Sequence, residues 1–71
     1  MQLGPNDPEI LRAGARTDVN SGNYARAVER LERARELDPR NAAVLNTLST
    51  DYLFTGRLQE AEEVSNAVIA L

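Results

Sequence analysis

The feature that most constrains the fold of this chain is a resemblance of the sequence to itself. The stretch "QLGPNDPEI" from Gln2 is followed thirty-four residues later by the similar stretch "ELDPRNAAV" from Glu36. The same spacing joins further pairs: Leu3 and Leu37, Pro5 and Pro39, Leu11 and Leu45, Gly22 and Gly56, Ala27 and Ala61, Glu29 and Glu63, and Leu37 and Leu71. A period between about 20 and 50 residues indicates an array of stacked structural units.

Helix-start and helix-stop signals divide each unit into two helices. Side chains that can accept hydrogen bonds from free N–H groups precede three of the expected helices, at Asp7, Asn23 and Asn41. Gly22 and Gly56 are expected to end the first and third helices in the left-handed conformation. The expected helices run from about residue 8 to the NSGN turn at 20–23, and over about 24–37, 42–55 and 58–71. Short turns make consecutive helices antiparallel.

Apolar residues at helical spacing predict which face of each helix is buried. For the second helix the buried face is expected to be Ala27, Val28, Leu31, Ala34 and Leu37. The apolar positions of the other helices are Ile10, Leu11, Ala15 and Val19; Val44, Leu45, Leu48, Tyr52 and Leu53; and Ala61, Val64, Val68 and Leu71. Small residues among them allow two helix backbones to approach closely.

With this pattern the sequence resembles the tetratricopeptide repeat family, whose unit has 34 residues and two antiparallel helices. The first unit matches the family pattern at Leu11, Ala15, Gly22, Ala27, Leu31, Ala34 and Pro39, and the second at Leu45, Leu48, Ser49, Tyr52, Gly56 and Ala61. The resemblance implies an all-α fold, with helix-turn-helix repeats stacked as a right-handed α-solenoid. Gly14 and Asp18 stand where the family has larger groups, so we expect the first helix to pack weakly there.

The repeat also predicts how the chain is divided. Residues 1–7 are expected to be the tail of a preceding repeat or an N-terminal cap, 8–41 the first unit, and 42–71 a second unit truncated at its end. The chain is therefore expected to be a slice of a longer array or a minimal two-unit module. An end face that includes Val64, Val68 and Leu71 then needs a neighbouring unit, a second copy or a partner to cover it.

Composition argues against several classes of function. The chain has no Cys, His or Lys, so the usual nucleophiles and bases near neutral pH are missing and we expect no enzyme. A net charge of −3 and few aromatic residues argue against nucleic-acid binding. No long apolar run predicts a membrane span. No spacing of acidic residues fits a metal site, and no glycine pattern fits a cofactor phosphate.

A binding surface remains as the candidate functional site. The resemblance implies that the first helix of each unit lines a concave groove, here with Arg12, Arg16, Asn20, Asn46, Thr50, Leu53 and Phe54. Arg12 and Arg16 lie one helical turn apart, and with Asn46 they would direct hydrogen-bond donors toward an anion. An equally good interpretation is a solvated helix face on which Glu9 and Asp18 partly balance the two arginines. Phe54 fits a ligand contact or packing between units.

These observations predict a non-catalytic scaffold or adaptor that binds a partner peptide or helix, with an acidic group or a C-terminal carboxylate. Two alternatives stay open: self-association through the exposed end helices, and a regulatory repeat region of a larger enzyme. The Ala and Arg bias favours a bacterial source. A cytoplasmic location is slightly favoured, and a periplasmic one fits if the chain belongs to a longer exported protein.

Overall fold

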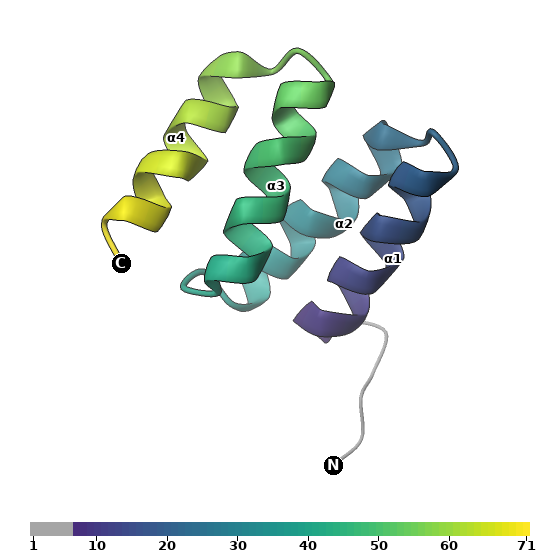
Figure 1. Cartoon of the computed structure of the whole chain (residues 1–71). Coiled ribbons are helices and arrows are strands. Elements are labelled where there is room, and N and C mark those ends of the chain that lie inside the picture. The colour runs from purple at the N-terminus through teal and green to yellow at the C-terminus, as the bar shows by residue number, and fades with distance from the viewer. Residues whose placement is uncertain (1–6) are drawn as a thin grey trace.

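The computed structural model describes residues 7–71, which form four α-helices (Figure 1). Their bounds are Pro8–Asn20 (α1), Tyr24–Leu37 (α2), Ala42–Phe54 (α3) and Leu58–Ile69 (α4). The four helices expected from the sequence are confirmed, although α3 and α4 end slightly earlier than predicted. The predicted tail of a preceding repeat lies outside the described residues, apart from Asp7.

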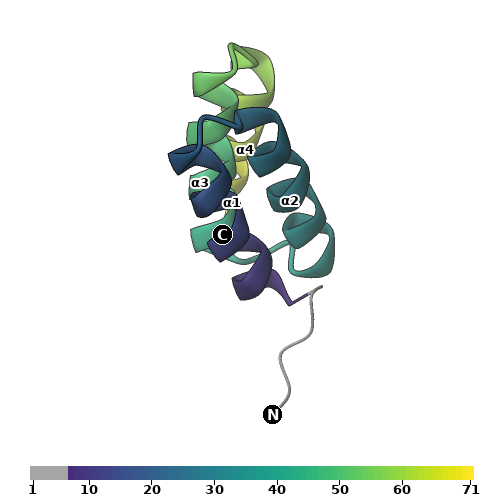
Figure 2. The same cartoon turned by 90° about the vertical axis from the view of Figure 1, so that its right-hand side faces the viewer.

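Consecutive helices are antiparallel, and they form two hairpins that lie side by side (Figure 1). Seen from the side, α1 and α3 occupy one layer while α2 and α4 occupy the other (Figure 2). The molecule is a slab of 35 × 30 × 13 Å. Helix α3 is central, because it packs against α1, α2 and α4.

The turns are built from the residues that the sequence singled out. Asp7, Asn23 and Asn41 each accept a hydrogen bond from the first turn of the following helix, at 2.9, 3.2 and 3.2 Å. Gly22 and Gly56 have positive φ angles of 80° and 76°. The backbone N–H after each glycine donates to the carbonyl five residues earlier, which satisfies the free end of the helix. Local chemistry therefore sets where α1 and α3 stop.

The core lies along the line where the two hairpins meet. It consists of Ala15, Ala27, Val28, Leu31, Leu45, Leu48, Tyr52, Ala61 and Val64, with Leu11, Ala34 and Val44 in a smaller cluster. Leu37 was expected on the buried face of the second helix but is exposed, and Ile10, Leu53 and Leu71 of the apolar sets are exposed as well. All four lie at or near the end of a helix, where fewer neighbours cover a side chain.

Weak packing of α1 at Gly14 and Asp18 was also a wrong expectation. The Arg30 side chain crosses from α2 and lies against Gly14, in space that a Cβ atom would take. Its Nε atom is 2.8 Å from Oδ2 of Asp18. A long side chain from the neighbouring helix thus replaces the larger groups of the family pattern.

Candidate functional site

A groove of about 320 Å³ lies between α1 and α3. It is lined by Arg12, Arg16 and Val19 from α1, and by Thr47, Thr50, Asp51 and Phe54 from α3. Four of the predicted site residues, Arg12, Arg16, Thr50 and Phe54, therefore come together in one place. The other three, Asn20, Asn46 and Leu53, are exposed on the same helices but do not line this groove.

The two arginines of the groove are not equivalent. Arg12 is held by Glu9, with its Nη2 2.9 Å and its Nε 3.3 Å from Oε2 of that carboxylate. Hydrogen bonding from Arg12 in turn lowers the pKa of Glu9, with a smaller contribution from Asn41. Within residues 7–71, Arg16 is exposed and has no ion pair. Arg16 is thus the groove cation that is available to a ligand.

The interpretation as a solvated face expected Glu9 and Asp18 to balance Arg12 and Arg16, and only Glu9 does so. Glu9 does neutralise Arg12, as the sequence predicted. Asp18 does not balance either groove arginine, because its carboxylate pairs with Arg30 of α2. Arg16 is therefore the arginine of this face that has no ion pair within residues 7–71.

The apolar part of the groove comes from Val19 and Phe54. Val19 is half-buried against the core, whereas Phe54 remains 64% exposed. The Phe54 ring also contacts Tyr24 of α2, with ring centroids 5.5 Å apart and the planes tilted by 36°. Phe54 thus contacts the first unit through Tyr24 and also lines the groove.

Thr47 and Asp51 are groove residues that sequence reasoning missed, and Asp51 is buried. A signal for it exists, because residues 44, 48 and 51 follow the i, i+4, i+7 spacing of a buried helix face. The two threonines of the groove do not supply it with donors. Thr47 and Thr50 donate their hydroxyl protons to carbonyl groups of their own helix, at 2.8 and 3.0 Å.

The family follows from a comparison with known proteins. A protein-family model described as tetratricopeptide repeat matches residues 18–70, which is most of the chain. The chain belongs to the tetratricopeptide repeat family. Tetratricopeptide repeats are generally protein–protein interaction modules and are usually non-catalytic. A comparison with curated proteins gives no match.

The membership confirms the all-α, paired-helix architecture predicted for this tetratricopeptide repeat chain. In the part that the structure describes, every helix is too short or too polar to cross a membrane. Residues 7–71 also contain no cluster of three or more side chains suited to hold a metal ion.

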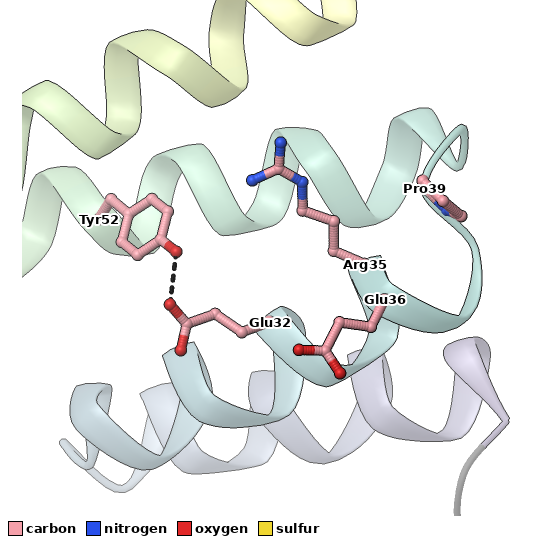
Figure 3. A pocket seen from close by; sticks show the side chains of 5 residues that line it. All are labelled: Glu32, Arg35, Glu36, Pro39 and Tyr52. Carbon is pink, nitrogen blue, oxygen red and sulfur yellow. Dashed lines mark hydrogen bonds between the residues drawn. The ribbon is translucent and has the colours of Figure 1, made fainter.

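The repeat has a second hollow, of about 550 Å³, which shares no lining residue with the groove. It is lined by Glu32, Arg35, Glu36, Pro39 and Tyr52 (Figure 3). Across it the Tyr52 hydroxyl donates to Oε2 of Glu32 at 2.7 Å. Burial, aided by this hydrogen bond, raises the pKa of Tyr52.

Arg57 completes the contacts around Tyr52 in this tetratricopeptide repeat. Its guanidinium carbon lies 4.9 Å from the centroid of the Tyr52 ring, and its Nη2 is 2.7 Å from Glu60 and 3.8 Å from Glu32. These side chains are already paired with one another. We therefore interpret the hollow as part of the contact between the two units. The groove between α1 and α3 is the stronger candidate for a ligand site.

Proposed function

We propose that this chain is a protein-interaction module of the scaffold or adaptor type, and that the groove between α1 and α3 binds a segment of a partner protein. The partner segment carries an acidic group, from a side chain or a C-terminal carboxylate, close to an apolar side chain. The observation that carries this proposal is the exposed guanidinium of Arg16, which has no ion pair within residues 7–71, in a groove that Val19 and Phe54 also line.

The chemistry of Arg16 favours a carboxylate. A guanidinium group presents a planar fork of N–H donors, which two carboxylate oxygens accept together. The acidic group of the partner is expected to pair with Arg16 at close range, since the net charge of −3 of the whole chain does not attract anions in general. Arg12, which is tied to Glu9, contributes the apolar part of its side chain.

The apolar surface supplies the other half of the recognition. Phe54 is the large apolar side chain of the groove, and its exposed ring, in contact with Tyr24 on one side, offers apolar area to a ligand. Burying apolar area on such a ring contributes about 25 cal/mol per Å². An acidic residue next to Leu, Met or an aromatic residue in the partner fits both features.

A direct test compares three forms of the chain as baits in lysate of the source organism: the wild type, Arg16→Glu, and Arg33→Glu. Arg33 is exposed on α2 outside the groove, so its variant reproduces the change in net charge. A partner that is retained by wild type and Arg33→Glu but lost from Arg16→Glu supports the proposal. A partner retained equally by all three removes the groove from consideration.

Self-association is the second candidate, because apolar side chains are exposed on and beside α4. Leu58, Ile69 and Leu71 are exposed, with Ile69 83% accessible to solvent. Sedimentation of the wild type over a wide range of concentration tests this candidate. A mass that rises with concentration, and returns to that of the monomer in Ile69→Ser, supports it.

A further inference from the structure

The carboxyl group of Asp51 is a buried charged group that lines the groove. Asp51 is only 3% exposed, and its Oδ2 atom has no hydrogen-bond partner within residues 7–71. The side chain nevertheless lines the groove, together with Arg16 and Phe54. A buried carboxylate without a partner is costly in a folded protein, so its position at a ligand groove calls for an explanation.

The neighbouring groups do not supply the missing donor. Thr47 and Thr50 direct their hydroxyl protons into their own helix. From α1, Arg12 and Arg16 line the same groove, but neither forms an ion pair with Asp51 in the described part of the chain. Burial alone raises the pKa of Asp51, as expected for a carboxyl group that lacks a compensating charge.

We infer that the groove recognises a partner segment with two opposite charges, in which a Lys or Arg side chain reaches Asp51 while the acidic group pairs with Arg16. This inference rests on the proposed function and adds the basic residue to it. A cation is the occupant that complements the charge of a buried carboxylate as well as its unused acceptor.

The arrangement gives the groove a means of discrimination. A purely acidic segment would satisfy Arg16 but leave Asp51 without a partner, and would place a second negative charge near it. A purely basic segment would satisfy Asp51 but meet the positive charge of Arg16, which lines the same groove. A segment with both charges satisfies Asp51 and Arg16 together.

The test is a selection of phage-displayed random octapeptides on the folded wild-type chain, on Asp51→Asn and on Glu63→Gln. Glu63 is exposed on α4 outside the groove, so its variant removes one negative charge without touching the site. Wild type and Glu63→Gln should enrich sequences that combine Lys or Arg with Asp or Glu. Asp51→Asn should lose the preference for the basic residue, and a selected peptide should bind it at least about tenfold more weakly.

The possible outcomes distinguish a failure of the inference from a failure of the proposed function. Enrichment of acidic and apolar residues without a basic one overturns the inference and leaves the proposed function standing. A basic preference that persists in Asp51→Asn overturns the inference as well. A failure of the wild type to enrich any sequence overturns both.

A second measurement does not depend on the folding of the variant. The carboxyl carbon of Asp51 in the wild type can be followed by NMR titration, with and without a selected synthetic peptide. A bound Lys or Arg should lower the pKa of Asp51. An unchanged pKa at saturating peptide overturns the inference.

Discussion

Arg30 of α2 lies over Gly14 of α1, so that the guanidinium group occupies the place of a missing side chain. From there Arg30 reaches Asp18, with its Nε 2.8 Å from Oδ2 and no well-aligned hydrogen bond between them. Glycine inside a helix normally costs about 1 kcal/mol relative to alanine. Here Gly14 provides the room in which Arg30 compensates the largely buried carboxylate of Asp18.

This relationship predicts a coupled pair of substitutions. Gly14→Ala alone should stabilise the fold by clearly less than the usual ~1 kcal/mol, because the new methyl group displaces Arg30 from Asp18. In an Arg30→Ala background the same change should give its full benefit. Urea unfolding of the wild type, both single variants and the double variant measures the coupling. Additive effects within about 0.3 kcal/mol would contradict the prediction.

Tyr52→Phe should weaken the joint between the two units. Loss of the hydroxyl bond to Glu32 is expected to cost about 0.5–1.5 kcal/mol at pH 7, measured by urea unfolding. Tyr24→Phe is the matched control, since Tyr24 packs its ring against Phe54 and its hydroxyl makes no hydrogen bond within residues 7–71. Equal effects of the two variants would show that the Glu32 contact contributes nothing.

Because the pKa of the Tyr52 hydroxyl is raised, we also expect the fold to lose stability at alkaline pH. The pKa of Tyr52 is raised in the folded state, so above about pH 10 the folded chain retains a proton that the unfolded chain has lost. Stability from this group is therefore complete below pH 10 and falls as pH rises further. Thermal melts of wild type and Tyr52→Phe between pH 8 and 11 should show the steeper decline in the wild type. Parallel curves would refute this assignment.

Asp51→Asn should stabilise the chain near neutral pH. Burial raises the pKa of Asp51, so the folded state binds its proton more tightly than the unfolded state does, and stability falls as pH rises from about 4. Removing the charge should add about 1–2 kcal/mol at pH 7 and little at pH 3. Melting temperatures of the two forms at both pH values measure this. A less stable variant at pH 7 would mean that the carboxylate has a partner in solution.

Asn41→Ala should destabilise the start of the second unit. The Asn41 side chain accepts from the N–H of Val44 at 3.2 Å and donates to Asp38 at 3.3 Å. Loss of such a cap typically costs about 1 kcal/mol, which urea unfolding resolves. Asn46→Ala, on the exposed face of α3, is the control and should be neutral or slightly stabilising. A neutral Asn41→Ala would show that water replaces the cap.

The sequence predicted well whatever depends on neighbours along the chain. The helix starts at Asp7, Asn23 and Asn41 and the turns at Gly22 and Gly56 are local, because each uses atoms within a few residues. The core could be predicted for a related reason, since helical spacing determines which side chains share a face.

What the sequence did not predict depends on contacts between helices. From the sequence, Gly14 and Asp18 indicated weak packing of the first helix. In the fold, Arg30 of α2 lies beside both residues. Asp51 lies on a buried face by spacing, but its lack of a partner follows only from what α1 presents to it. At the groove, the sequence placed Arg12 and Arg16 together, whereas the structure makes Arg16 the available cation.

The position of α4 has a consequence for how the chain opens. Within residues 7–71, α4 packs against α3 alone, partly through a 2.8 Å bond between the Ser49 and Ser65 hydroxyls. The groove, in contrast, draws its residues from α1 and α3. The last helix is therefore the first segment expected to exchange its amide protons through local opening, while the groove between α1 and α3 stays assembled. If the proposed function holds, partial unwinding of α4 would leave binding in place.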